Sequence, residues 1–505
     1  MKNSKNDSSE SEKNKNVDNS LRIQILQHVK RFSIGSLIGG IGRFFNNYFG
    51  ALFLGPTIWG IWQGAKLVEL YGGNLHLGVI NGMHREIPIL RGKKEIEQQI
   101  IIADVTFTFS FIIAIISFLG ILIISFFVVK RPELKLSLQF ISAILLFQYI
   151  NSFYGTYLRA NNEFNTVSKI AIIDGLGSLF SVALIFFFGL LGFLGGQVLC
   201  SLVTAYYSWW KSSYTINWRW DNKVLKSLII IGFPIMLMVF ANIIFTTIDR
   251  LLILKFLSAK DLGFYSLENI VFAPLLMIFT ASSSVMYPRF AEKYGEATNS
   301  LSLKRYITIP MENLAASIPI LIGVIFIALP SLTTVFLPKY INGIQAAQIL
   351  LIGLFFYGVT GMAGNMILTI NKQVLNLGIL SISAILNLIF SYIALKLKYG
   401  IVGVALGTSL GYFIYFLATT ILAMRFARAS LAETRKLLLK IIGPIFYVCI
   451  IIIVFSKFMP IYSSNMTLMI NKTIFQELIF LCLNSYFIYR IFQGEIGNLI
   501  MKRKK

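Results

Sequence analysis

Residues 109–129 read FSFIIAIISFLGILIISFFVV, a continuous apolar run without a charged side chain. A helix needs about 20 mostly apolar residues to cross the hydrocarbon core of a bilayer, so this run predicts a transmembrane helix. Runs of similar character follow on both sides of it through most of the chain. They predict about fourteen spans, at residues 32–54, 58–83, 109–129, 136–158, 171–191, 193–210, 228–256, 262–290, 310–329, 344–370, 374–395, 401–424, 441–455 and 473–491.

The composition also indicates a membrane protein. Of the 505 residues, 56% are hydrophobic and 13% are charged, whereas a soluble domain carries roughly 25% charged residues. A net charge of +23 would suggest nucleic-acid binding in a soluble protein. Here the basic residues lie mainly between apolar runs, so we predict no nucleic-acid partner. Cys200, Cys449 and Cys482 lie inside apolar runs and are predicted to be packing residues, not metal ligands.

The basic residues predict the orientation of the chain. Cytoplasmic loops of membrane proteins are enriched in Lys and Arg. If the N-terminus is cytoplasmic and the predicted spans alternate, most of the 45 Lys and Arg residues fall on the cytoplasmic side. A missed span would invert every later loop. The distribution therefore supports the span count and a cytoplasmic location of both termini.

Two halves of the chain resemble each other. Residues 46–62, NNYFGALFLGPTIWGIW, align without gaps with residues 249–265, DRLLILKFLSAKDLGFY, and this alignment pairs Gly60 with Gly263. Two weaker matches follow in the same order, residues 157–165 with 367–376 and residues 192–198 with 400–406. An even number of spans per half makes this a parallel repeat. We predict two six-helix lobes around a central cavity, plus two extra C-terminal helices.

The predicted division of the chain follows from the spans and the repeat. Residues 1–20 are polar and low in complexity, which is typical of disorder. No short apolar stretch with a cleavage site follows them, so they are not a signal peptide. We predict a disordered or interfacial cytoplasmic tail (1–30), an N-lobe of helices 1–6 (31–222), a C-lobe of helices 7–12 (223–430), helices 13–14 (431–495) and a basic cytoplasmic tail (496–505).

Three motifs resemble those of a known family. GPTIWGIW at residues 55–62 and LGVINGMHREIPILRGKKE at residues 77–95 resemble the N-terminal signature of bacterial oligosaccharide flippases. TIDRLLILKFLSAKDLGFYS at residues 247–266 is similar to the seventh-helix motif of the same family. This is the Wzx-type family of O-antigen and capsular-polysaccharide flippases. Its superfamily also contains multidrug-and-toxin extruders and the lipid II flippase.

The resemblance implies a function that composition and spacing do not reveal. It implies alternating access in the bacterial cytoplasmic (inner) membrane. The substrate would be an undecaprenyl-diphosphate-linked oligosaccharide, moved from the cytoplasmic to the outer leaflet, with polysaccharide polymerase machinery as a possible partner. The alternative is an H⁺- or Na⁺-coupled multidrug extruder of the same fold.

The absence of certain motifs restricts the possible energy sources for transport and argues against an enzyme. The sequence has no GxxxxGK[ST] motif for ATP binding. It also lacks the long outer loop expected of a membrane polymerase or glycosyltransferase. We therefore predict a transporter that needs no cofactor and draws on an H⁺ or Na⁺ gradient, the membrane potential or the polymerisation of its product.

Basic residues within or beside the spans are candidates for binding a diphosphate, because a buried charge is costly unless it has a function or a partner. Arg43 either pairs with another helix or faces the cavity. Lys66 is a cavity lysine or the partner of Glu69, three residues later. Arg85 contacts the headgroup or anchors the loop in the cytoplasm. Arg250 is a candidate receiver of the diphosphate at the outer side.

Acidic and imidazole groups in the spans are candidates for ion or proton coupling. Glu69 and His76 share one face of the predicted second span, where His76 is a proton relay or a hydrogen-bonded structural residue. Asp174 has no cation near it in sequence and is a candidate ion or proton site. Asp249 is a further candidate. It is adjacent to Arg250, so the two side chains project in different directions and should not pair.

Overall fold

The computed structural model describes residues 3–296, 300–460, 465–485 and 489, which are helical and contain no strand. Ten helical segments among them are long and apolar enough to cross a membrane. The prediction of an all-α, multi-pass membrane protein is therefore confirmed. The predicted tail at residues 496–505 lies outside the described residues.

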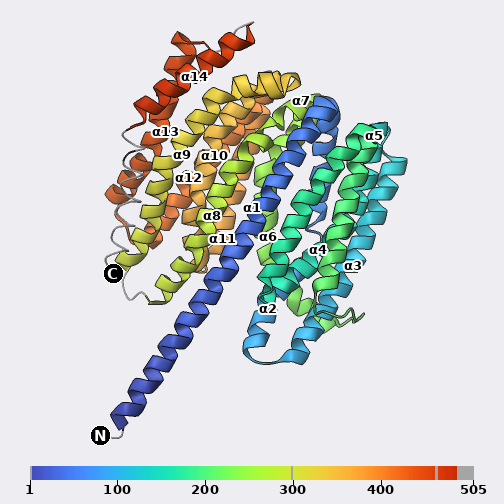
Figure 1. Ribbon diagram of the computed structural model, residues 1–505, viewed down its shortest axis with the longest axis vertical. Coiled ribbons are helices and arrows are strands. Elements are labelled where there is room, and N and C mark those ends of the chain that lie inside the picture. The colour runs from blue at the N-terminus through green and yellow to red at the C-terminus, as the bar shows by residue number, and fades with distance from the viewer. Residues whose placement is uncertain (1–2, 297–299, 461–464, 486–488, 490–505) are drawn as a thin grey trace. The chain divides into compact units, whose positions relative to one another are not determined.

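The helices in Figure 1 are α1 (Asn3–Gly72), α2 (Val79–Gly92), α3 (Ile96–Phe127), α4 (Pro132–Ala160), α5 (Phe164–Lys211), α6 (Asn222–Phe256), α7 (Ala259–Tyr265), α8 (Leu267–Glu296), α9 (Ser300–Phe336), the 3₁₀ helix η1 (Pro338–Gly343), α10 (Ile344–Thr369), α11 (Gln373–Lys396), α12 (Gly400–Phe426), α13 (Leu431–Phe458) and α14 (Met466–Leu483).

Two long helices are each interrupted at a glycine. In α1 the backbone leaves the helical region at Gly55 (φ 71°, ψ 169°), directly before Pro56. In α5 it does so at Gly189 (φ 55°, ψ −132°). Glycine adopts positive φ without a steric penalty, and the ring of proline excludes the hydrogen bond that would continue the helix. The interruption at Gly55 falls between the predicted spans 32–54 and 58–83, and the interruption at Gly189 falls just before the end of the predicted span 171–191. In both places two predicted spans follow one another almost without a loop.

The structure differs from the prediction in two places near the N-terminus. The predicted span at residues 58–83 is not one helix, because α1 ends at Gly72 and α2 begins at Val79. The turn between them ends at Gly78, whose φ of 81° is accessible to glycine. The helix α1 also extends back to Asn3, through the segment predicted to be disordered. Extending an existing helix requires no new nucleation.

The chain divides into two compact units. Unit 1 comprises Met1–Phe49 and Val68–Leu237, and unit 2 comprises Gly50–Leu67 and Met238–Lys505. The lobe boundaries proposed from the sequence, at residues 222 and 430, stay predictions.

In unit 1 the helices α1 and α5 are in backbone contact. A Cβ atom built on Gly39 would overlap the carbonyl oxygen of Ala171, and one on Gly42 would overlap that of Gly175. Small residues permit this close approach of helices in a membrane. As a result, side chains that flank the glycines of α1 lie within reach of α5.

The connection from α5 to α6, residues 212–221, folds back against unit 1. The buried Tyr214 hydroxyl donates to Asp104 Oδ1 at 2.7 Å. Further along, the Arg219 N–H donates to Thr108 Oγ1 at 3.1 Å. The ring of Trp218 lies over α3, 5.5 Å from the ring centroid of Phe107. These contacts hold the connection along the first half of α3.

In unit 2 the helix α10 packs against α8, α9 and α12, and α13 and α14 pack against α9. The segment after the break of α1 belongs to this unit. A Cβ atom built on Gly60 would overlap the carbonyl oxygen of Ala259, and one on Gly263 would overlap that of Pro56. The two glycines paired by the sequence repeat therefore lie against each other.

Candidate functional site

One ion pair joins two long helices of unit 1. Arg43 Nη1 donates to Asp174 Oδ2 at 2.7 Å, across 131 residues of sequence. Arg43 lies on α1 and Asp174 on α5, beside the glycine contact at Gly42 and Gly175. Both side chains are about half exposed, Arg43 at 48% and Asp174 at 44%. No cation lies near Asp174 in the sequence, but the close approach of α1 and α5 brings Arg43 to it.

Uncharged hydrogen bonds continue this contact toward the break of α1. Asn46 Oδ1 accepts from the Ser181 hydroxyl at 2.9 Å and from Gln197 Nε2 at 3.2 Å. Gln197 also donates to Ser181 Oγ at 2.8 Å. Asn46 and Ser181 are buried. Polar side chains thus join the two helices along their contact. Among these side chains only Arg43 and Asp174 are charged and half exposed.

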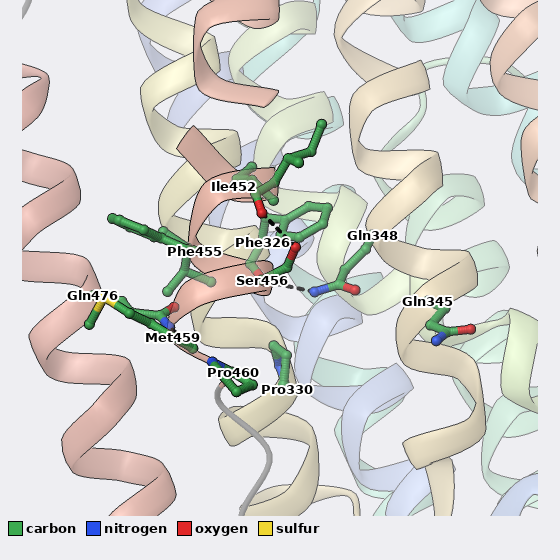
Figure 2. Close-up of a pocket in the computed structure, with 12 residues that line it drawn as sticks. Phe326, Pro330, Gln345, Gln348, Ile452, Phe455, Ser456, Met459, Pro460 and Gln476 are labelled. Atoms are coloured by element: carbon green, nitrogen blue, oxygen red, sulfur yellow. Dashed lines mark hydrogen bonds between the residues drawn. The ribbon is translucent and has the colours of Figure 1, made fainter. Parts of the chain in front are cut away.

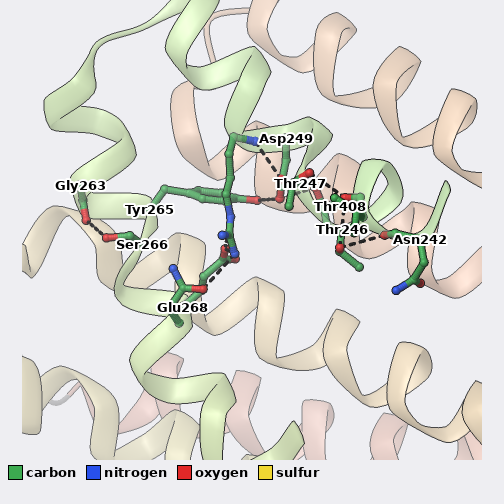
Figure 3. Close-up of polar contacts among 12 residues, drawn as sticks. Asn242, Thr246, Thr247, Asp249, Gly263, Tyr265, Ser266, Glu268 and Thr408 are labelled. Atoms are coloured by element: carbon green, nitrogen blue, oxygen red, sulfur yellow. Dashed lines mark hydrogen bonds and ion pairs between the residues drawn. The ribbon is translucent and has the colours of Figure 1, made fainter. Parts of the chain in front are cut away.

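A second polar cluster lies inside unit 2 (Figure 3). Asp249 is 1% exposed. Its Oδ2 accepts from the Tyr265 hydroxyl at 2.6 Å and from the Thr408 hydroxyl at 3.2 Å. Its Oδ1 accepts the backbone N–H of Arg250 at 2.8 Å. Asn387 Oδ1 extends the cluster by accepting a second contact from Thr408, at 3.2 Å.

The Arg250 side chain turns away from Asp249, as their adjacency predicts, and binds the next helix. Its Nη2 donates to Glu268 Oε1 at 2.7 Å and to Asn269 Oδ1 at 2.9 Å, and its Nε donates to Glu268 at 3.2 Å. Glu268 is 4% exposed and Arg250 is 19% exposed. Arg250 therefore makes three side-chain hydrogen bonds within the protein, whereas Arg43 makes one.

The charges of this second cluster do not balance. Asp249 and Glu268 are two buried carboxyl groups beside one guanidinium. Buried charges in a low-dielectric interior need compensation. A proton on one carboxyl group, or a bound monovalent cation, would supply the missing positive charge.

The remaining predicted residues lie apart from these two clusters. Lys66 Nζ is 5.6 Å from the ring centroid of Trp62, in cation–π geometry. His76 is buried, and its Nδ1 accepts the backbone N–H of Gly78 at 3.1 Å. That arrangement matches the structural interpretation of His76. Arg85 lies on α2 and is exposed, and Glu69 lies near the end of α1.

A cavity of 350 Å³ lies among α9, α10, α13 and α14 in unit 2 (Figure 2). Gln348 donates to the carbonyl oxygen of Phe326 at 3.0 Å, and Gln476 donates to that of Met459. With these amides engaged, the wall is largely apolar and suits hydrocarbon better than an anion. The lining residues are Phe326, Ile327, Pro330, Gln345, Gln348, Ile452, Ile453, Phe455, Ser456, Met459, Pro460 and Gln476.

Sequence reasoning missed several members of the second cluster. Glu268 lies near the beginning of the predicted span 262–290, where a charge stands out less than in the middle of a span. Tyr265, Thr408 and Asn387 carry no signal of their own, because uncharged polar residues are common in membrane helices. Among the described residues, no group of three or more His, Cys, Asp or Glu side chains has the arrangement of a metal site.

The chain matches a family of known proteins over more than half of its length. Residues 89–345 match the family described as polysaccharide biosynthesis protein. The chain is 26% identical over 230 residues to the teichuronic acid biosynthesis protein TuaB of Bacillus subtilis (strain 168), covering 44% of this chain and 47% of TuaB. It is 24% identical over 198 residues to an uncharacterized membrane protein of Methanocaldococcus jannaschii, covering 39% of each. The chain thus spans less than half the length of either relative.

Solved structures share the fold. An inward-facing multidrug resistance MATE family transporter of the MOP superfamily has a TM-score of 0.62 and 16% identity, covering 80% of this chain and 99% of that one. The lipid II flippase MurJ in an inward closed conformation has a TM-score of 0.62 and 15% identity, covering 91% of this chain and 98% of that one. At these identities the likeness shows that the chain shares the fold of a transporter and of a flippase.

Proposed function

The chain belongs to the polysaccharide biosynthesis protein family, and we propose that it is a bacterial flippase for a lipid-linked oligosaccharide. The substrate is an undecaprenyl-diphosphate-linked repeat unit, which the protein moves from the cytoplasmic to the outer leaflet by alternating access. The protein lies in the cytoplasmic membrane with both termini inside. Polymerase machinery on the outer side then uses the flipped product.

The observation that carries the proposal is the half-exposed guanidinium of Arg43 within the first span predicted from the sequence, residues 32–54. A charge at such a position is costly unless it serves a polar ligand or pathway. A guanidinium donates two parallel hydrogen bonds to a phosphate, which an ammonium does not. Arg43 donates a single hydrogen bond to Asp174, so its other N–H groups remain for a diphosphate. Arg250 makes three hydrogen bonds to Glu268 and Asn269, and Glu268 is only 4% exposed, so we assign Arg250 a structural role instead.

The uncompensated cluster around Asp249 supports coupling to a monovalent cation, H⁺ or Na⁺. It lies on α6, and Thr408 and Asn387 bring α12 and α11 to the same point. A cation that neutralises the second carboxylate would change the balance of interactions among these three helices. Coupling of this kind needs no cofactor.

The second candidate function is a cation-coupled multidrug extruder. The fold shared with the MATE transporter favours it. Such a protein requires an anionic site for cationic drugs, and a free Asp174 would offer one. In this structure Asp174 is neutralised by Arg43, which favours an anionic substrate.

The test is transport in reconstituted vesicles. Fluorescent undecaprenyl-diphosphate-linked sugar is placed in the inner leaflet, and its exposure outside is followed with a membrane-impermeant quencher. The wild-type protein should flip it, and Arg43→Ala should reduce the rate by about tenfold or more, the usual cost of losing a charge-assisted contact of about 1.5–3 kcal/mol. Arg43→Lys should retain part of the activity.

Lys440→Ala is the matched control, because Lys440 is also half exposed (49%) and paired with a carboxylate, Glu312, at 2.9 Å. It should flip at the wild-type rate. Full activity of a correctly inserted Arg43→Ala protein would show that Arg43 does not bind the substrate. Ethidium efflux without any flipping by the wild-type protein would favour the extruder.

A further inference from the structure

The two charged residues that the sequence assigned to separate roles form one site. Arg43 was predicted to bind substrate and Asp174 to couple an ion, yet their side chains meet at 2.7 Å. We propose that Asp174 is an internal competitor for the substrate. It holds Arg43 while the carrier is empty, is displaced by the diphosphate of the lipid headgroup, and returns to drive release. This inference rests on the proposed flippase function.

The side of α1 that carries Arg43 differs from its lipid side. Residues at helical spacing of three and four share a face. Ile34, Leu37 and Ile41 form one such row and are 46–49% exposed, as expected of a lipid-facing stripe. Arg43 belongs to a different row with Ser36, Gly40 and Asn47.

The helix α5 shows the same division. Leu176 and Phe180, spaced by four, are exposed at 47% and 55%. Asp174 instead shares a face with the buried Ser178 and Ser181. The exposed halves of Arg43 and Asp174 thus lie on the polar sides of their helices, where an anionic headgroup can reach them.

The two arginines of the candidate site show which ion pair is exchangeable. Arg250 makes three hydrogen bonds to Glu268 and Asn269, and Glu268 is nearly inaccessible. A ligand cannot replace Glu268 without opening the core. Arg43 makes one hydrogen bond, to a carboxylate that is 44% exposed. A diphosphate can replace that contact by the rotation of two side chains.

Displacement of Asp174 would leave the helices together. The backbone contacts of Gly39 with Ala171 and of Gly42 with Gly175 do not involve the ion pair. Neither do the hydrogen bonds of Asn46 with Ser181 and Gln197. The ion pair is therefore free to exchange partners while α1 stays on α5.

Competition explains why a substrate-binding arginine should have a carboxylate beside it. A lone guanidinium would bind a multiply charged diphosphate tightly and release it slowly. It would also leave the empty carrier with an uncompensated charge in the predicted first span. Asp174 supplies a negative charge when the diphosphate is absent, so Arg43 has an anionic partner in both the loaded and the empty carrier.

The variant Asp174→Asn tests this directly, because it removes the charge and keeps the shape. The probe is undecaprenyl diphosphate, with inorganic pyrophosphate as the headgroup alone. The purified variant should bind both about two- to fivefold more tightly than wild type, the range set by the strength of a partly exposed ion pair, at most about 1 kcal/mol. Release measured as multiple-turnover flipping should be slower. The gain should vanish in Arg43→Ala/Asp174→Asn.

Each outcome supports or overturns a specific claim. Glu312→Gln, which breaks the comparably exposed pair with Lys440, should leave binding unchanged. Unchanged or weaker binding by Asp174→Asn, while Arg43→Ala abolishes binding, overturns the competitor role and leaves the flippase function intact. A marked fall in the melting temperature of Asp174→Asn assigns the pair a structural role and also overturns it. If Arg43→Ala binds both probes as tightly as wild type, Arg43 is not the substrate-binding residue, and the proposed substrate site is overturned.

Discussion

Arg250 lies beside two buried carboxyl groups, and its loss should be among the most damaging single changes in unit 2. Without it, Glu268 loses both guanidinium hydrogen bonds while only 4% exposed. Removing one partner of a buried ion pair costs about 3–5 kcal/mol, whereas replacing both partners by uncharged groups is often tolerated. Arg250→Met should therefore lower the melting temperature strongly, and Arg250→Met/Glu268→Gln should recover most of the loss.

Thermal unfolding in detergent, read by intrinsic fluorescence, measures this difference. Arg43→Met is the control, since an ion pair that is about half exposed contributes at most about 1 kcal/mol. A melting temperature of Arg250→Met equal to that of Arg43→Met would show that the second cluster does not stabilise the fold.

At the level of residues, the sequence identifies charges in the membrane but not their partners. Arg43, Asp174, Asp249 and Arg250 were each recognised because a charge stands out in an apolar run. The pairing of Arg43 with Asp174 spans 131 residues, and no spacing rule within one helix reaches that far. It depends on how closely α1 approaches α5, which the glycines permit but do not by themselves specify.

The connection at residues 212–221 differs from the helices in its composition, because it is rich in exposed tryptophan. It carries or adjoins Trp209, Trp210, Trp218 and Trp220, four of the six tryptophans of the chain, which are 46–63% exposed. Lys211 lies over the ring of Trp210 at 3.7 Å. The connection ends at Asp221, whose pKa is lowered by hydrogen bonds from the backbone N–H groups of Val224 and Lys223. Exposed Trp beside basic residues is typical of the membrane–water interface.

These four tryptophans should report contact with lipid headgroups. In vesicles, lipids brominated near the headgroup should quench their fluorescence more than lipids brominated near the chain end. Replacing Trp218 and Trp220 by Phe should remove a large part of that quenching. Trp59 and Trp62 are buried, at 1% and 2% exposure, and should give an unquenched background. Quenching by aqueous acrylamide with none by brominated lipid would place the connection in water instead.

Elements were predictable where hydropathy is continuous and less so where polar residues bend the chain. The predicted spans 344–370, 374–395 and 401–424 agree with α10, α11 and α12 to within two residues at each end. The turn from Gly72 to Val79 was missed, because an apolar average over residues 58–83 hides a short glycine-rich interruption. Hydropathy also could not show that residues 212–221 fold back on α3, since Tyr214 and Trp218 find their partners through tertiary packing.

At the scale of the whole chain, the weak sequence repeat has structural counterparts. Asn162 and Asn371 lie in its second match and both adopt a left-handed backbone, with φ of 63° and 56°. The alignment also pairs Asn46 with Asp249. Asn46 accepts hydrogen bonds from Ser181 and Gln197 within unit 1, and Asp249 accepts from hydroxyls within unit 2. The two halves thus keep a hydrogen-bond acceptor at one position, and only the second half gives it a charge.

The contact of Gly60 with Gly263 has the form that a two-fold repeat requires. Gly60 lies against the carbonyl oxygen of Ala259, and Gly263 lies against that of Pro56. These four residues form two pairs that the repeat exchanges, so the contact is reciprocal, as at a two-fold interface. Each glycine therefore lies against a backbone carbonyl oxygen of the other segment.

This reciprocity predicts the effect of adding a single methyl group. Gly60→Ala and Gly263→Ala should each lower stability by about 1–3 kcal/mol, the usual cost of overpacking, and by similar amounts. Each change separates the same two segments, so the double variant should lose less than the sum of the two. Thermal unfolding of the three variants measures both effects. Gly120→Ala is the control, because no atom lies within 4 Å of its added Cβ, and alanine in an exposed helix is favourable. Additive losses, or losses no larger than that of Gly120→Ala, would contradict a shared contact on the axis of the repeat.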